Sequence, residues 1–288
     1  MPRRTPPAPV LEALACPVCR AGLTLGDRGL SCPGAHTFDL AREGYASLLT
    51  GATPPGSGDT KEMVADRLRF QQHGHYDPIG HALARALDVP GLPGQPLVVD
   101  AGGGTGHYLA LVLEALPGAH GLTTDVSKFA ARKAAKVHPR AGAATADTWR
   151  GLPLRTGSAD AVLNVFAPRE GAEFHRVLRP GGLLVVVTPD TDHLAELRGP
   201  LGLLEVDRHK DERLSRGLHG HFEPLESTPL RFTLQLDHAD AATVVGMGPS
   251  ARHMSPAELA DRVAALPDPV AVTASVRVNT YRPRPAGR

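Results

Sequence analysis

A continuous apolar run that leads directly into a glycine-rich loop is the feature that most constrains how this chain folds. The run "PLVVDA" (residues 96–101) is typical of a strand buried on both faces, and "HYLALVLEAL" (107–116) has the pattern of a helix. Between them stand Gly102, Gly104 and Gly106. Glycines let a ligand approach the backbone, and a helix N-terminus offers free N–H groups. The loop alone fits a dinucleotide site or simply a tight strand–helix turn.

Strands and helices alternate along most of the chain, and this alternation predicts an α/β fold with a largely parallel sheet. Further strands are predicted over 120–125, 142–147, 159–166, 181–189, 230–237 and 270–281. Further helices are predicted over 61–70, 127–137 and 169–178, and from about 77, 238 and 256. The segment "TGATPPGSGDT" (50–60) is rich in turn residues and is predicted to be a linker.

Carboxylates stand at the ends of three successive predicted strands. Asp100 precedes the glycine loop, Asp125 ends the next strand, and Asp147 follows the third. A carboxylate at the position of Asp125 binds ribose hydroxyls in nucleotide-binding folds. Asp147 is placed to hold an adenine amino group, with Trp149 and Arg150 as walls of that pocket. The alternative for Asp125 and Asp147 is helix capping or turn formation.

Charge and hydropathy limit the partners and the location of the protein. The net charge of +1 gives no global attraction to nucleic acid, so such contacts must use local patches. We find no apolar stretch of about 18 residues that would span a membrane, and no signal-peptide pattern at the start. We therefore expect a cytoplasmic protein with no membrane partner. Clustered cysteines in that compartment indicate a metal more than a disulfide.

The three cysteines and one histidine form two close pairs near the start of the chain. Cys16 and Cys19 are separated by two residues, and twelve residues later Cys32 is followed at the fourth position by His36. Four such donors suit tetrahedral zinc and leave no open position, so the metal is expected to be structural. So short a segment scarcely folds without its metal. The alternative is three idle thiols beside a surface histidine.

The glycine spacing, the acidic residue before it and the segment "RVLRPGGLLVVVTP" (176–189) resemble the class I S-adenosylmethionine-dependent methyltransferases. A nicotinamide-binding loop would usually show G-x-G-x-x-G instead. The resemblance runs from about Gln95 to the C-terminus. It implies a Rossmann-like, seven-stranded sheet with an antiparallel last strand, and S-adenosylmethionine as the cofactor.

Several segments narrow the resemblance: "CPVC", "CPGAHTFDLAREGYASLL", "GHYDPI", "NVFAPRE" and "MGPSARH". They make the chain similar to the bacterial 23S rRNA (guanine-N1)-methyltransferases, and to the Gram-positive branch with the tylosin-resistance enzyme. The resemblance implies methyl transfer to N1 of a hairpin-loop guanine in 23S rRNA, facing the macrolide site, by a homodimer. We accordingly expect a zinc-binding RNA-recognition module over 1–50, a linker and helices over 51–94, and a methyltransferase domain over 95–288.

The family's functional residues are carried over position by position. The implied zinc ligands are Cys16, Cys19, Cys32 and His36. The implied cofactor contacts are Tyr76, Asp100, Gly102, Gly104, Gly106, His107, Asp125, Asp147, Thr148 and Asn164. The loop reads "GGGTG" where many relatives have "GCGEG", so side-chain contacts from Thr105 are not carried over.

The segment "NVFAPRE" follows the fourth strand of the methyltransferase domain, where this fold brings the atom that accepts the methyl group. Asn164 is the leading catalytic candidate because its amide can both donate and accept, although it is no strong base. The alternative is a strand-end turn residue. Pro168 is expected to rigidify the loop, and Arg169 to meet phosphate or base. The group that accepts the guanine N1 proton stays unassigned, and water is one candidate.

Two groups of polar residues have open interpretations. A basic stretch fits phosphate binding or a solvated helix face equally well: Lys128, Arg132, Lys133, Lys136 and Arg140. The histidines at 209, 219 and 221 suggest a metal, but their spacing favours a polar loop. His73 and His75 flank Gly74, and His75 either covers the methionine end of the cofactor together with Tyr76 or packs in the core.

Two other functions compete with rRNA methylation. One is methyl transfer to a small molecule, with the zinc module as a lid or dimer contact. The other is a zinc-bearing RNA-binding protein that has lost catalysis. Intact Asp100 and Asp125 argue against the second.

Overall fold

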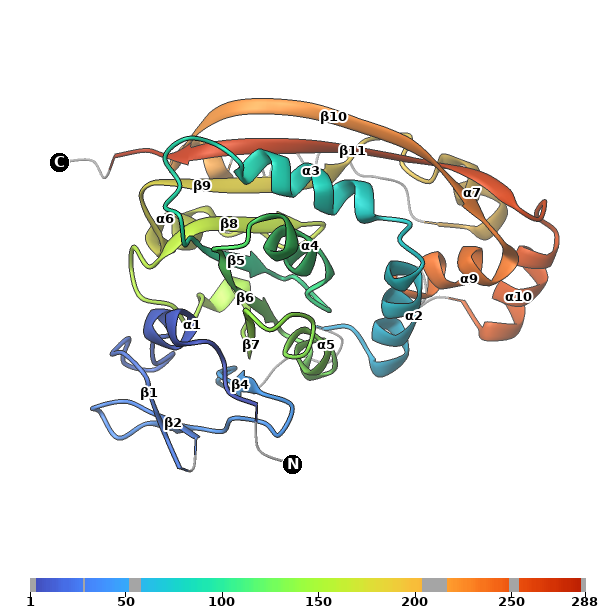
Figure 1. The fold of residues 1–288 in the computed structure, drawn as a ribbon. Helices are drawn as coiled ribbons and strands as arrows, with labels where there is room; N and C mark the ends of the chain where they lie inside the picture. Colours follow the sequence, from blue (N-terminus) through green and yellow to red (C-terminus); the bar gives the residue numbers. More distant parts are fainter. Residues whose placement is uncertain (1–3, 28, 52–57, 204–216, 249–253, 286–288) are drawn as a thin grey trace.

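An eight-stranded mixed sheet forms the centre of the molecule, in the order β10-β11-β9-β8-β5-β6-β7-β4 (Figure 1). The computed structural model describes residues 4–27, 29–51, 58–203, 217–248 and 254–285. Within those residues no helix is long and apolar enough to cross a bilayer. A separate small sheet, β1-β2-β3, lies in the N-terminal part of the chain.

Five of the six parallel strands of the sheet lie within residues 97–189. They are β5 (Leu97–Ala101), β6 (His120–Asp125), β7 (Ala141–Thr145), β8 (Ala159–Val165) and β9 (Leu178–Pro189). Every residue of β5 is buried, as its unbroken apolar run predicts. Because β5 lies between β6 and β8, the glycine loop after it opens at the carboxyl edge of the sheet, where this class of fold binds ligands.

The last two strands form a long antiparallel hairpin. β10 (Phe222–Leu236) pairs with β11 (Val270–Pro283), and β11 also pairs antiparallel with β9. The expected class I sheet with its antiparallel last strand is therefore confirmed. β10 begins eight residues before the predicted Leu230, because its first half is an exposed edge that carries no burial pattern.

The eighth strand was not predicted. β4 (Tyr45–Ser47) comes from the cysteine-containing segment and pairs in parallel with β7, with Ser47 opposite Thr145. The main sheet therefore extends into residues 1–50. The domain boundaries at 50 and 94 stay predictions, and residues 52–57 of the expected linker lie outside the described residues.

Helices cover both faces of the sheet. α3 (Asp77–Leu87) and α4 (His107–Ala115) pack over one face, and α6 (Gly171–Val177) over the other. Alternate residues of β5 point to opposite sides, so Val98 packs with α3 and α4 whereas Val99 packs with α6.

The remaining helices lie around the sheet's ends. α2 (Lys61–Gln72), α9 (His238–Gly246) and α10 (Pro256–Ala264) gather at one end, and α5 (Lys128–Ala134) lies beside β7 (Figure 1). α7 (Ala195–Leu201) had no counterpart in the sequence prediction.

The N-terminal segment is a small ribbon that shares a core with the methyltransferase sheet. It consists of α1 (Ala8–Ala13), β1 (Thr24–Gly26), β2 (Gly29–Ser31) and β3 (Thr37–Phe38). Gly29 has φ +139°, and a Cβ there would lie 2.4 Å from the Phe38 carbonyl oxygen, so the turn requires glycine. Cys16 and Leu30 belong to the same apolar cluster as Phe174 of α6.

Candidate functional site

A cavity of about 540 Å³ opens at the carboxyl ends of β5, β6, β7 and β8. Its walls come from the glycine loop, the turns after β6, β7 and β8, and α2. The lining residues are Gly58, Asp59, Arg67, Gln71, Gly102, Gly103, Gly104, Tyr108, Asp125, Val126, Ala146, Asp147, Thr148, Trp149, Arg150, Val165, Phe166, Ala167 and Pro168. Five of the ten expected cofactor residues therefore line one cavity: Gly102, Gly104, Asp125, Asp147 and Thr148.

Backbone geometry explains the glycines of the loop. Gly102, Gly104 and Gly106 have φ values of +74°, +58° and +79°, a region that side chains rarely adopt. A Cβ on Gly102 would also lie 2.7 Å from the Cβ of Ala167 across the cavity wall. Gly106 is the N-cap of α4 and packs against Thr123, so it shapes the loop without lining the cavity.

Asp125 ties the glycine loop to the end of β6. Its Oδ2 accepts a hydrogen bond from the Gly104 N–H at 3.0 Å, and its Oδ1 accepts one from the Ser127 N–H at 2.8 Å. Burial raises the pKa of this carboxyl, although the two N–H groups act in the opposite direction. Asp125 thus makes the hydrogen bonds expected of a turn-forming residue, and it also lines the cavity.

Asp147 likewise caps a local turn and lines the cavity. Its side chain accepts a hydrogen bond from the Trp149 N–H at 3.0 Å and thereby caps the short 3-10 helix η1 (Thr148–Arg150). η1 was not predicted from the sequence. All three of its residues line the cavity, with Trp149 more than half exposed at the rim.

Asp100 lies beneath the glycine loop and does not line the cavity. It is fully buried, and neither carboxylate oxygen has a hydrogen-bond partner among the described residues. A Cβ on Gly103 would overlap this carboxylate, so the loop covers it directly. Burial, and to a lesser degree the charge of Asp125, raises the pKa of Asp100 to about 7.

Three other expected site residues lie outside the cavity lining. Tyr76 is buried, and its hydroxyl lies 3.1 Å from Nε2 of His193. His107 is the first residue of α4, and its Nε2 lies 3.0 Å from Oδ1 of Asp77. Asn164 is the third. Their contact with the cofactor stays a prediction.

Asn164 and Arg169 hold the loop that follows β8. The Asn164 amide nitrogen donates to the carbonyl oxygens of Ala101 at 3.2 Å and Pro168 at 2.9 Å. Its Oδ1 accepts a hydrogen bond from Nε of Arg169 at 3.1 Å. Asn164 is fully buried and Arg169 nearly so. In this structure both side chains fix the shape of the loop, and direct contact with substrate stays a prediction.

Sequence reasoning missed several cavity residues, among them Asp59, Arg67, Gln71 and Phe166. Arg67 of α2 donates from Nη2 to Oδ2 of Asp59 at 2.7 Å and to the Met247 carbonyl oxygen at 3.0 Å. Gln71 accepts a hydrogen bond from the Thr105 hydroxyl at 2.5 Å. No motif marks α2, and only the tertiary packing against α9 brings it to the cavity.

Phe166 follows β8, on the opposite side of β5 from β6 and Asp125. It has φ +52° and is 38% exposed, although it is a bulky aromatic residue. Its N–H donates to the Val187 carbonyl oxygen at 3.2 Å, which anchors this strained position to β9. The signal was present in the sequence, since an aromatic residue follows Asn164 by two positions.

The structure distinguishes among the basic residues and histidines whose roles the sequence left open. Lys128, Arg132, Lys133 and Lys136 are exposed. Arg140, in contrast, donates to the carbonyl oxygens of Leu113, Leu116 and Ala119, at and just after the C-terminal end of α4, and is structural. His209 lies outside the described residues, and His219 and His221 belong to no metal-binding group among those described.

His73 and His75 pack against α9. His73 Nδ1 and His75 Nε2 each lie 2.7 Å from a different carboxylate oxygen of Asp240, which is buried. The two histidines therefore join the turn after α2 to α9, and His75 does not line the cavity.

The four expected metal ligands converge on one point. The distance from Cys19 Sγ to Cys32 Sγ is 3.6 Å, and His36 Nδ1 lies 3.6 Å from Cys16 Sγ and 3.4 Å from Cys32 Sγ. Tetrahedral zinc places two sulfurs about 3.8 Å apart and a sulfur and a nitrogen about 3.6 Å apart. The donor set therefore fits zinc closely. Burial opposes ionisation of Cys32, but hydrogen bonds with His36, Cys19 and Cys16 together outweigh it and lower the pKa of Cys32 to about 6.

The fold and the two sites define a class I S-adenosylmethionine-dependent methyltransferase with an N-terminal structural zinc site. Two family models agree with this class. A zinc-ribbon family described as "RlmA, N-terminal" matches residues 14–51, and a family described as "Methyltransferase domain" matches residues 99–186. A solved complex of the Haloferax volcanii Trm112 methyltransferase activator and a methyltransferase shares the fold, with a TM-score of 0.51 and 17% identity over 78% of this chain and 97% of that one.

Two curated relatives cover almost the whole chain. A protein of Micromonospora griseorubida, named provisionally as a 23S rRNA (guanine-N1)-methyltransferase, is 52% identical over 95% of this chain and 98% of its own length. The 23S rRNA (guanine(748)-N1)-methyltransferase of Streptomyces fradiae is 51% identical over 96% of this chain and 99% of its own. The chain belongs to the 23S rRNA (guanine-N1)-methyltransferase family, as the sequence motifs predicted.

Proposed function

We propose that this protein transfers a methyl group from S-adenosylmethionine to N1 of a guanine in a 23S rRNA hairpin loop. The observation that carries the proposal is the end-to-end match to two proteins named for this reaction, which spans the zinc site and the cavity alike. A small-molecule methyltransferase would not need to retain both parts at this identity. The proposed location is the cytoplasm.

The cavity supplies the groups that this reaction requires of the cofactor site. When bound, S-adenosylmethionine provides a methyl group on a positively charged sulfur. Asp125 would hold the ribose hydroxyls, Asp147 would hold the adenine amino group, and the loop from Gly102 to Gly104 would allow close approach to the backbone. Methyl transfer is an in-line displacement, so alignment of the two reactants is the main task of these residues.

The acceptor guanine is expected at the β8 end of the cavity. Phe166 offers an exposed aromatic face there, and a loop base can be splayed out and stacked on such a face. Asn164 and Arg169 would act by holding Phe166 and Pro168 in place, because the Asn164 amide donates to the Pro168 carbonyl oxygen and accepts a hydrogen bond from Nε of Arg169. The N1 proton would leave to water or to a group on the RNA side.

The surface of α5 is the proposed phosphate contact. Lys128 and Lys133 are exposed on it and Lys136 is exposed just after it, and α5 begins three residues after Asp125, which lines the cavity. α5 also packs beside β4, so one RNA hairpin could contact both this helix and the zinc-binding segment. Lysine–phosphate contacts give affinity that falls as salt rises.

Primer extension tests the reaction directly. A 23S rRNA transcript that contains the guanine named in the Streptomyces fradiae relative is incubated with the protein and S-adenosylmethionine. N1 methylation blocks the Watson–Crick edge, so reverse transcriptase should stop one nucleotide before the target. The Asp125→Ala variant and a reaction without cofactor are the controls. No stop on naked RNA or on ribosomal subunits, with zinc and cofactor bound, would refute the proposal.

Homodimer formation and macrolide resistance complete the proposal. Both rest on the family resemblance and have separate tests. Light scattering of the purified protein should give twice the mass of the 30.3 kDa chain. Expression in a macrolide-sensitive host should raise the tolerated macrolide concentration for wild type but not for Asp125→Ala. A monomeric mass would refute homodimer formation, and equal macrolide tolerance of both strains would refute the role in resistance.

A further inference from the structure

The first turn of the zinc ribbon has a strained residue between the metal ligands and the methyltransferase domain. Arg20, directly after Cys19, has φ +62°. Its N–H donates to the Cys16 carbonyl oxygen at 2.8 Å, and the Cys16 N–H donates to the Ala21 carbonyl oxygen at 2.7 Å. A non-glycine residue keeps such a conformation only where its surroundings enforce it. The closed turn therefore sets the direction of the Arg20 side chain.

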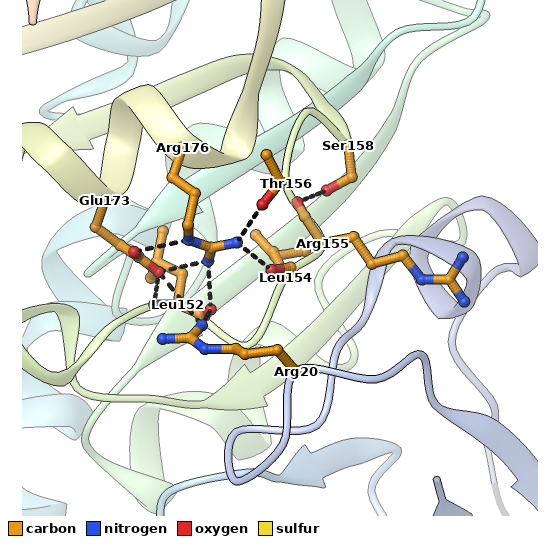
Figure 2. Close-up of polar contacts among 8 residues, drawn as sticks. All are labelled: Arg20, Leu152, Leu154, Arg155, Thr156, Ser158, Glu173 and Arg176. Atoms are coloured by element: carbon orange, nitrogen blue, oxygen red, sulfur yellow. Dashed lines mark hydrogen bonds and ion pairs between the residues drawn. The ribbon is translucent and has the colours of Figure 1, made fainter. Parts of the chain in front are cut away.

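Arg20 extends to one peptide group of the methyltransferase domain. Its Nη1 donates to the Leu152 carbonyl oxygen at 2.9 Å and lies 3.6 Å from Oε1 of Glu173 in α6. Oε1 of Glu173 accepts the Leu152 N–H at 2.6 Å, and Arg176 Nη2 also donates to the Leu152 carbonyl oxygen, at 3.0 Å. Figure 2 shows both arginines and Glu173 converging on Leu152 from opposite sides. Both backbone polar groups of Leu152 are thus fixed by charged side chains.

Leu152 ends the turn that forms the adenine side of the cavity. Gly151, just before it, has φ +99°, and a Cβ there would lie 2.7 Å from Nη2 of Arg20 and 3.2 Å from Oε1 of Glu173. The preceding residues Asp147 and Thr148–Arg150 all line the cavity. The Arg20 guanidinium therefore packs against the back of the same turn that faces the cofactor.

Other contacts from the zinc-binding segment reach this turn. The Thr50 carbonyl oxygen accepts a hydrogen bond from Nη1 of Arg150 at 3.1 Å, and the Leu48 N–H donates to Oγ1 of Thr145 at 3.2 Å. A small crevice also lies between the two parts, lined on one side by Pro17 and on the other by Asp147. The turn is held between the ribbon and the cavity.

We propose that Arg20 and Glu173 are positioning residues that couple zinc binding in the ribbon to cofactor binding in the cavity. With zinc in place, the Cys16–Ala21 turn is closed and Arg20 holds residues 147–152 in the shape that faces the adenine. Without zinc, the turn loses the restraint that directs Arg20. Because such coupling is reciprocal, bound cofactor should also raise the affinity of the ribbon for zinc by the same factor. This inference concerns cofactor binding alone and holds whichever guanine is methylated.

Calorimetry with S-adenosylmethionine on the full-length, zinc-loaded protein tests the coupling. Arg20→Ala should bind the cofactor roughly 5- to 20-fold more weakly, within the range of typical couplings between sites. The fold should survive, because Arg176 still binds the Leu152 carbonyl oxygen. Arg155→Ala is the matched control, since Arg155 packs against Gly22 of the ribbon but does not reach Leu152 (Figure 2). Its cofactor affinity should equal that of wild type.

Zinc affinity gives a second readout that does not depend on activity. The equilibrium partition of zinc between the protein and a chromogenic chelator is measured with and without S-adenosylmethionine. The cofactor should raise the zinc affinity of wild type and have a much smaller effect on that of Arg20→Ala. Equal cofactor affinity of Arg20→Ala and wild type at full zinc occupancy would overturn the proposal. If Arg20→Ala does not hold zinc, the measurement on wild type decides, and a zinc affinity of wild type that the cofactor leaves unchanged would overturn the proposal.

Discussion

The buried carboxyl of Asp100 makes a sharp prediction about stability and pH. Asp100→Asn keeps the shape of the side chain and removes its charge. The folded-state pKa is about 7, against 3.8 for an exposed aspartate. The folded state therefore holds this proton more tightly, and the stability that the group contributes is fully present below pH 3.8 and is lost as pH rises through 7. Three pKa units correspond to about 4 kcal/mol.

The measurement compares urea unfolding of the cofactor-free wild type and Asp100→Asn between pH 5 and pH 8. The unfolding free energy of Asp100→Asn minus that of wild type should rise by about 1.4 kcal/mol per pH unit up to pH 7 and then level off. Asp261→Asn changes an exposed aspartate on α10 and is the matched control. A difference between Asp100→Asn and wild type that is the same at pH 5 and pH 7 would refute the reasoning.

Four further predictions concern the sites and one arginine. Asp125→Ala should weaken S-adenosylmethionine binding by about 1–3 kcal/mol in calorimetry, because a hydrogen bond to a charged group is lost; unchanged affinity would reject the ribose role. Cys16→Ser, or chelation of the wild type, should lower the melting temperature, and an unchanged melting curve would speak against structural zinc. Phe166→Ala should raise KM for RNA by the about 1–3 kcal/mol of a lost base stack, with cofactor affinity intact; a change in the cofactor Kd instead would contradict this. Arg140→Met should cost about 2 kcal/mol of stability because three carbonyl oxygens lose a charged donor, whereas Lys136→Met should leave the melting temperature unchanged and weaken RNA binding.

Burial decided how much of the fold was visible in the sequence. β5 is buried along its whole length, so its apolar run marked it clearly, whereas β7 is equally buried but consists of Ala, Gly and Thr and was marked less clearly. The first half of β10 is an exposed edge with Pro224 and Pro229, and it carries no such pattern. β4 has only three residues, and only its pairing with β7 makes it part of the main sheet.

Some residues of the candidate site could likewise be predicted from the sequence, and others could not. Asp125 and Asp147 were predictable because strand ends in a parallel sheet meet at one edge. Arg67 reaches the same cavity from a helix, through contacts with the distant segment around Met247, and local sequence does not encode that contact. Asn164 lies where predicted along the strand, but the direction of its amide depends on packing among Ala101, Pro168 and Arg169.

The pairing of β4 with β7 has a consequence for how the protein is made. Residues 45–47 leave the ribosome before residues 141–145, and at typical synthesis rates the interval is roughly 5–20 seconds. During that time the ribbon's four ligands can capture their ion, but the strand beside them has no partner to join. When β7 arrives, β4 covers its outer edge, which would otherwise offer open backbone groups to neighbouring chains. The metal-binding segment thereby also limits aggregation of the newly made sheet through this edge.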